Sequence, residues 1–172
     1  MYNKYDNLEK LDREAFVMAL RLIRFDGDEI LRKISKPVTE INESILTLLD
    51  DMKETLKGNG VGLAAPQIGV LKRIIVVDVG EGPIEIINPE IFDEEGEQIG
   101  VEGCLSMPEV FGEVKRPMKL RVRGLDRTGK KFEMEAEELL AIVTCHEVDH
   151  LNGILFKDKV IKFIDLEGEK KR

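Results

Sequence analysis

No apolar stretch of the 172-residue chain approaches the roughly 18 residues that a membrane-spanning helix needs. The first residues, MYNKYDNLEKLDREAF, are too charged to form the apolar core of a signal peptide. The chain also has no Pro- or Ser-rich linker, low-complexity tract or internal repeat. These absences argue against a membrane partner, and we expect one globular domain that works in the cytoplasm.

Basic residues are in deficit: 26 Lys and Arg residues stand against 34 Asp and Glu residues, for a formal net charge of −8. Binding to nucleic acid depends on neutralising phosphates with Lys and Arg side chains. The charge balance therefore argues against nucleic acid as a specific partner. The short basic cluster at residues 170–172 is expected to be a solvated terminus.

Histidine and cysteine are scarce, with two residues of each type. In a chain of this size without an export signal, separated cysteines such as Cys104 and Cys145 are more often free thiols, catalytic groups or metal ligands. A disulfide between them is the alternative. His146 and His150 stand four residues apart, which makes them the most informative pair in the composition.

The apolar pattern predicts two helices separated by strands. The first helix is expected to begin at Asn42 or Ser44 and to end at Gly58, and the second to run from about Glu137 to Gly153. Strands are expected at 73–79, 84–92 and about 97–105, with a β-hairpin at 118–135. This order predicts an α+β fold, with mixed or antiparallel β-sheets wrapped around a central C-terminal helix.

The string HEVDH at 146–150 falls in the second predicted helix. At about 100° per residue, His150 lies about 40° from His146, and Glu147 lies about 100° from it. The apolar residues closest to the same direction are Leu139, Ile142 and Val143. Both imidazoles therefore project from the apolar face, where they can bind one transition metal while the glutamate transfers a proton. Buried histidines satisfied by hydrogen bonds are the alternative.

An HExxH string needs a third metal ligand to be convincing. A metzincin protease would have a histidine where this chain has Phe156, so that interpretation fails. A thermolysin-like protease needs a glutamate on a further helix. Glu167 and Glu169 lie in the last few charged residues, with little chain left to build that helix.

The two cysteines differ as third ligands. Cys145 lies about 100° from His146 on the side away from His150, so we expect it to be a small buried residue. Cys104 lies where a strand ends beside a glycine, and it can deliver a thiolate to a metal while the Leu105 amide faces the same cavity. A buried structural thiol is an equal alternative for Cys104.

The segment GVGLAAPQIG at 60–69 is rich in small residues. It formally matches a GxGxxA dinucleotide fingerprint, but a helix precedes it where a strand is required, and Pro66 interrupts the phosphate-binding helix. We therefore reject that interpretation. Small residues also let a peptide backbone approach, and Gln67 offers an amide donor, although on this segment alone a structural turn is preferred.

Taken together, the segments GVGLAAPQIG, EGCLS at 102–106 and HEVDH resemble the three motifs of the peptide deformylase family, in order and with compatible separations. The resemblance extends from about residue 18 to about residue 165. It implies an α+β metallohydrolase that removes the formyl group from N-formylmethionyl nascent peptides and releases formate.

The resemblance implies that Cys104, His146 and His150 bind one divalent metal ion, with water in the fourth position. Glu147 would take the proton of the water that attacks the formyl carbon, and would then pass a proton to the departing amine. The resemblance favours Fe(II) as the metal in the cell, while one thiolate and two imidazoles also suit Zn(II), Ni(II) and Co(II).

The same resemblance assigns the oxyanion to the Leu105 backbone N–H and the Gln67 side-chain amide. Glu102 is expected to pair with Arg116, and Asp149 to orient or hold the helix. The residues implied to face the substrate are Gly60, Val61, Gly62 and Leu63 in the loop, Glu102 and Gly103 in the strand, and Leu139, Ile142 and Val143 on the helix.

Some features depart from the family pattern. Cys145 stands where members often have glutamine. Many members also have a long C-terminal helix, whereas only residues 154–172 follow Gly153 here, which argues against docking on the ribosome through a basic C-terminal helix. Residues 1–17 are expected to be an extension outside the core, disordered or not native, and 18–172 a single catalytic domain. We expect a cytoplasmic protein of bacterial type, and a protein of organellar origin is the alternative.

We expect a monomer that contacts nascent peptides and, transiently, the ribosome exit region. Two rival functions stay open at this point. A metallopeptidase acting on internal peptide bonds would share HExxH but would not account for Cys104 or Gln67. In a non-catalytic protein, the metal would only stabilise the fold, and replacing Glu147 would have no effect on any activity.

Overall fold

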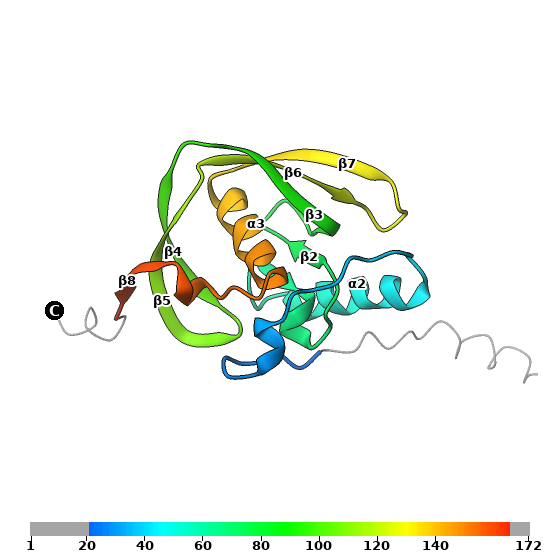
Figure 1. The fold of residues 1–172 in the computed structure, drawn as a ribbon, viewed down its shortest axis with the longest axis horizontal. Helices are drawn as coiled ribbons and strands as arrows, with labels where there is room; N and C mark the ends of the chain where they lie inside the picture. The colour runs from blue at the N-terminus through cyan, green and yellow to red at the C-terminus, as the bar shows by residue number, and fades with distance from the viewer. Residues whose placement is uncertain (1–20, 166–172) are drawn as a thin grey trace, which may run out of the picture.

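Two antiparallel β-sheets enclose a central helix in residues 21–165, the part of the chain that this computed structural model describes (Figure 1). The expected extension at 1–17 lies outside the described residues. The larger sheet has the order β1-β2-β3-β6-β7 and the smaller sheet the order β4-β5-β8. The α+β class and the wrapping of sheets around a helix are therefore confirmed.

The strands of the larger sheet are β1 (Gly62–Ala64), β2 (Ile74–Val77), β3 (Ile84–Glu95), β6 (Lys119–Leu125) and β7 (Lys131–Glu137). Those of the smaller sheet are β4 (Gln98–Cys104), β5 (Met107–Arg116) and β8 (Val160–Ile164). Two of the connections between the sheets are short: residues 96–97 join β3 to β4, and residues 117–118 join β5 to β6. The smaller sheet is thus a continuation of the larger one that bends around the helix.

The first helix, α2 (Glu43–Leu56), has the predicted N-cap, because the Asn42 side chain accepts a hydrogen bond from the Ile45 N–H at 3.2 Å. Its apolar face packs against β1 and β2. The buried residues of this face are Ile45, Leu48, Leu49, Met52 and Leu56. Beyond the helix, Gly58 has a φ of 74°, the left-handed conformation that the sequence predicts there.

The central helix, α3 (Glu138–Leu151), packs against β1, β2 and β7 of the larger sheet. Ala141 and Val143 lie in an apolar cluster with residues of β2, β3 and β6. Three short 3₁₀ helices, η1 (Glu29–Arg32), η2 (Ala65–Ile68) and η3 (Phe156–Asp158), complete the described elements. No helix within residues 21–165 is long and apolar enough to span a membrane.

Three strands were not expected from the sequence: β1, β5 and β8. The β5 sequence, MPEVFGEVKR, contains Pro108 and Gly112 and lacks a regular alternation of apolar and polar residues. Its burial alternates only from Gly112 to Arg116, while residues 107–111 all line the site cavity. Pairing with β4 and β8 determines this strand, and pairing between distant segments leaves no local pattern in the sequence.

Candidate metal centre

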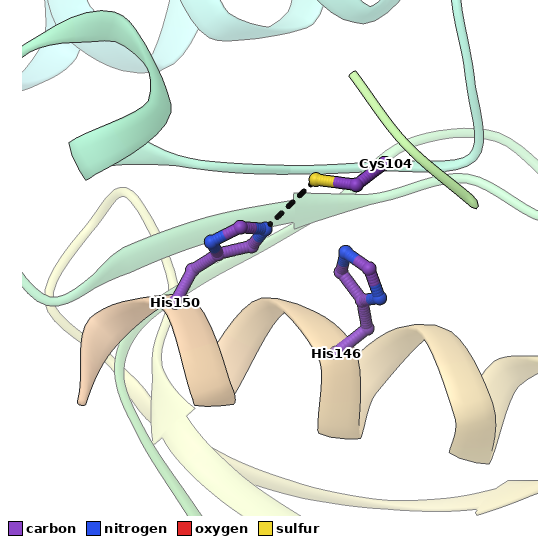
Figure 2. A group of neighbouring side chains, drawn as sticks. All are labelled: Cys104, His146 and His150. Carbon is purple, nitrogen blue, oxygen red and sulfur yellow. Dashed lines mark hydrogen bonds between the residues drawn. The ribbon is translucent and has the colours of Figure 1, made fainter. Parts of the chain in front are cut away.

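One thiol and two imidazoles converge between the smaller sheet and the central helix. Cys104 is the last residue of β4, while His146 and His150 project from neighbouring turns of α3 (Figure 2). Their ligand atoms all lie within 4.8 Å of one another, and Cys104 Sγ is 3.2 Å from His150 Nε2. A tetrahedral metal with bonds of about 2.0–2.3 Å holds its ligand atoms roughly 3.3–3.7 Å apart. This donor set therefore fits one transition-metal ion.

The His146 ring is held in a single orientation. Its Nδ1 lies 2.8 Å from Glu102 Oε2, and a carboxylate can only accept a hydrogen bond, so Nδ1 is the protonated nitrogen. This tautomer leaves Nε2 free for a metal. The ring also stacks on Phe156, with centroids 5.9 Å apart and an interplanar angle of 25°. Phe156, the residue that excluded a metzincin third ligand, thus packs against the first histidine.

A buried network of charges lies behind His146. Arg116 on β5 donates from Nε to Glu102 at 2.7 Å and from one terminal nitrogen to Asp149 at 2.6 Å. The expected Glu102–Arg116 pair is confirmed. Lys159 donates to the other Asp149 oxygen at 2.8 Å, so the two carboxylates face two cations. Burial opposes ionisation of Glu102, but hydrogen bonds from His146 and Arg116 hold its pKa below the ordinary range.

Glu147 lies on α3 beside the three candidate metal ligands, and the backbone of β1 passes close to its side chain. The residue is 4% exposed, and burial raises the pKa of Glu147 to about 7. Its Oε2 has no hydrogen-bond partner among residues 21–165. A Cβ atom at Gly62 would lie 2.3 Å from Glu147 Oε1 and 2.7 Å from a Val143 methyl. Gly62 is therefore required by this close approach of β1 to the glutamate.

Gln67 presents its amide nitrogen to the site. Its Oε1 accepts a hydrogen bond from the Ala64 N–H at 2.8 Å, and only the oxygen of the amide can do so. Nε2 is therefore directed to the other side, 3.5 Å from Cys104 Sγ and 3.2 Å from Ser106 Oγ. Leu105 directly follows Cys104 and lines the same cavity.

A cavity of about 380 Å³ opens in front of these groups. Of the residues expected to face a substrate, the ones that line it are Gly60, Val61, Gly62, Glu102, Gly103, Leu139, Ile142 and Val143. Gln67, Cys104, His146 and Glu147 line it as well. Its walls come from both sheets and from α3, so the chain brings together segments that are far apart in the sequence.

Leu63 is the one expected substrate-facing residue that does not line the cavity. Its side chain is fully buried in the apolar cluster with α2 and β2. The reason is the alternation of side chains along a strand: Gly62 faces Glu147, so its neighbour Leu63 faces the opposite side of β1. Any contact of Leu63 with a substrate is limited to its backbone.

Several cavity residues were missed in the sequence analysis. They are Asn59, Val101, Met107, Pro108, Glu109, Val110 and Phe111. Residues 107–111 all belong to β5, the strand that has no clear sequence pattern. Lys159 was missed for a similar reason, because it reaches Asp149 only through the turn that follows α3.

Cys145 lies in different surroundings from Cys104. Its thiol is free and packs in the apolar cluster on the side of α3 that faces the larger sheet. Burial raises the pKa of the Cys145 thiol to about 12, which makes it inert as a nucleophile or ligand. The expectation of a small buried residue is confirmed, and Cys104 is also a free thiol, so the two cysteines form no disulfide.

Comparisons with known proteins agree with this geometry. The chain matches the polypeptide deformylase family model over residues 20–164. It is 63% identical over 156 residues to a peptide deformylase of Acetivibrio thermocellus, covering 90% of this chain and 92% of that protein. It is 64% identical over 151 residues to a peptide deformylase of Thermoanaerobacter pseudethanolicus, covering 87% of this chain and 95% of the relative.

Solved structures give the same result. The crystal structure of peptide deformylase from Thermotoga maritima has a TM-score of 0.81 at 43% identity, covering 83% of this chain and 98% of that one. A peptide deformylase of Synechococcus elongatus in complex with actinonin has a TM-score of 0.79 at 38% identity, covering 81% of this chain and 78% of that one.

Proposed function

The chain belongs to the polypeptide deformylase family, and from this premise we propose a role for each group in its site. It is a hydrolase that removes the N-formyl group from nascent peptides, as members of this metal-dependent family do. The observation that carries the assignment of roles is the convergence of Cys104, His146 and His150 at one end of a cavity that Glu147 and Gln67 also line.

We propose Cys104, His146 and His150 as the three protein ligands of one divalent ion, with Fe(II) as the metal in the cell and Zn(II), Ni(II) or Co(II) as alternative occupants. When bound, the ion supplies Lewis-acid activation of water and of the formyl oxygen. The Glu102 carboxylate supports this role, because it fixes the tautomer of His146 and increases the basicity of the other ring nitrogen.

Glu147 is the proton-transfer group. Its buried carboxylate lines the cavity next to the ligand group, and one of its oxygens has no partner in residues 21–165. In the proposed reaction, the carboxylate accepts a proton from the water that attacks the formyl carbon. It then donates that proton to the nitrogen of the departing amine, so that formate and a free N-terminus result.

The Gln67 amide and the Leu105 backbone N–H are proposed to stabilise the oxyanion. The Ala64 N–H fixes the Gln67 amide in one orientation, so its N–H groups are directed to the site before a substrate arrives. A donor fixed in advance needs little reorganisation during the reaction, which is the condition for effective oxyanion stabilisation.

The apolar part of the cavity is proposed to bind the methionine side chain. Leu139, Ile142 and Val143 form one wall of it. Gly62 of β1 and residues 101–104 of β4 border the cavity. Among the strands of residues 21–165, β1 and β4 each have one edge without a partner strand. A peptide in extended conformation can hydrogen-bond to such edges, which suits a nascent N-terminus.

The finer biological setting is also a proposal. The chain's named relatives come from bacteria, and its substrates are nascent peptides, which supports action in the cytoplasm and a transient encounter with the ribosome exit region. We expect the protein to work as a monomer, since all proposed groups come from one chain. Analytical ultracentrifugation of the metal-loaded protein tests the oligomeric state.

The proposed roles are tested by formate release from formyl-Met-Ala-Ser, using protein prepared and assayed without oxygen. Glu147→Gln is expected to bind the metal but to release no formate at a measurable rate. Formate release by this variant at the parent rate would overturn the role of Glu147. Cleavage of casein without formate release would support an internal peptidase instead. Equal activity after aerobic preparation would argue against iron, because a ferrous–thiolate site is sensitive to oxidation.

A further inference from the structure

Gly100 on β4 lies against Ile142 on α3, at the apolar wall of the cavity. A Cβ atom at Gly100 would lie only 2.7 Å from Ile142 Cδ1 and 3.8 Å from its Cγ1. The distance to Cδ1 is shorter than two carbon atoms adopt unless one of them shifts, whereas the distance to Cγ1 is an ordinary van der Waals contact. The Ile142 methyl therefore occupies the space that a side chain at residue 100 would need.

The backbone at Gly100 does not itself require glycine. The residue is paired with Val114 in the regular β4–β5 ladder, and its φ is not positive. Glycine in the interior of a strand weakens it and often marks a close approach by another group. Here the approaching group is the Ile142 side chain. Glycine at residue 100 therefore leaves room for this side chain and is not needed for the backbone conformation.

Ile142 has one open side. Its neighbours Ala141 and Val143 are buried in the apolar cluster behind α3, whereas Ile142 is half-buried and lines the cavity together with Leu139. A Cδ1 methyl displaced from Gly100 can move into the cavity, because Ile142 borders that open space. Since Cδ1 is the flexible end of its side chain, this movement costs little stability.

We propose that Gly100 is a specificity-determining residue, because it receives the Ile142 Cδ1 methyl and thereby keeps the apolar subsite wide enough for a side chain as long as methionine. Gly100 itself does not line the cavity and acts through Ile142. The inference rests on the proposed role of this cavity as the methionine subsite. It adds that the width of the subsite is controlled from β4.

The test compares kcat/KM for formyl-Met-Ala-Ser, formyl-norleucyl-Ala-Ser and formyl-Ala-Ala-Ser in the metal-loaded parent and in Gly100→Ala. A subsite narrowed by one methyl group should lower kcat/KM about tenfold for the two long side chains. The value for formyl-Ala should change by less than about twofold, since that side chain does not reach Ile142.

Two further variants separate this effect from general damage. Ile142→Val removes Cδ1, so in this background Gly100→Ala should change the ratio of the methionine to the alanine substrate by less than about twofold. Gly112→Ala on β5 is the matched control, because its Cβ would lie 2.7 Å from both Val160 γ-carbons, and neither residue lines the cavity. It should leave the substrate ratio unchanged, and thermal unfolding reports the stability of each variant.

A parent-like substrate ratio in folded Gly100→Ala would overturn the proposal, as would an equal loss for all three substrates. If Gly100→Ala does not fold, the comparison of Gly100→Ala/Ile142→Val with Ile142→Val decides, and a large change in ratio between them contradicts the mechanism. Equal kcat/KM of the parent for formyl-Met-Ala-Ser and formyl-Ala-Ala-Ser would instead contradict the assignment of this cavity as the methionine subsite. A parent that releases no formate would count against the proposed function itself.

Discussion

The two sheets that enclose α3 contribute differently to the site. The larger sheet faces the helix with fully buried apolar side chains, among them Ile75, Leu120 and Val122. The smaller sheet faces it with a thiol, a carboxylate and a guanidinium, those of Cys104, Glu102 and Arg116. The comparison indicates that the two sheets have different roles: the larger sheet holds the helix in place, and the smaller sheet determines what the two histidines can bind.

The two cysteines provide the strongest test of these different roles. Cys104→Ala removes a ligand on the side of the smaller sheet, and we expect a loss of formate release of about 10³-fold or more, since metal activation contributes several kcal/mol. Cys145→Ala changes the side of α3 that faces the larger sheet, and activity should be retained while stability falls by about 1 kcal/mol. Equal losses in both variants would contradict the comparison.

Gln67 is an exception that sharpens the comparison, because η2 follows β1 of the larger sheet. Gln67→Ala is expected to lower kcat about 10²–10³-fold by removing an oxyanion donor. Gln67→Glu keeps the acceptor for the Ala64 N–H but removes the donor, so it should be impaired to a similar degree. Steady-state kinetics on formyl-Met-Ala-Ser measure both. Full activity in Gln67→Glu would exclude a donor role.

A direct comparison between the sheets pairs Glu102→Gln with Leu120→Ala. The first variant weakens the support of His146 and should lower metal affinity about 10–100-fold, measured by competition with a chelator. The second leaves a cavity in the apolar contact with α3 and should lower the free energy of unfolding by about 2–5 kcal/mol. Its metal affinity, corrected for the folded fraction, should equal that of the parent. A loss of metal affinity in Leu120→Ala but not in Glu102→Gln would contradict the roles assigned to the two sheets.

The smallest effect is expected at the outer end of the charge network. The Lys159 side chain is 41% exposed, and its bond to Asp149 is screened by solvent. Lys159→Met should therefore change the free energy of unfolding by less than about 1 kcal/mol and leave kcat/KM within about twofold of the parent. A loss as large as that of Glu102→Gln would mean that the buried pairs depend on the surface lysine.

The sequence predicted the elements whose pattern is local. α2 and α3 have clear apolar spacing, and the hairpin of β6 and β7 has alternating residues around a turn, so their positions were confirmed to within a few residues. β5 and β8 depend on pairing between segments that are distant in the chain, which no local pattern records. The same reason explains why Pro108, Glu109 and Phe111 were missed in the cavity.

More of the candidate site than of the surrounding strands could be named from the sequence, because three short motifs carry most of the chemistry expected of the site. The orientation of side chains was less accessible. Leu63 lies within a motif, yet strand alternation turns its side chain into the core. Glu102 was expected to face the substrate, and although it borders the cavity, its carboxylate is bonded to His146 and Arg116. Such details depend on partners that are tens of residues away.

We propose that the thiolate of Cys104, and not that of Cys145, binds the same metal ion as His146 and His150. Replacement of the native metal by Co(II) gives a direct test, since a thiolate ligand adds a charge-transfer absorption that imidazole ligands lack. We expect this absorption in the parent, Cys145→Ala and Glu147→Gln proteins, and its loss in Cys104→Ala. Absorption that persists in Cys104→Ala, or disappears in Cys145→Ala, would contradict it.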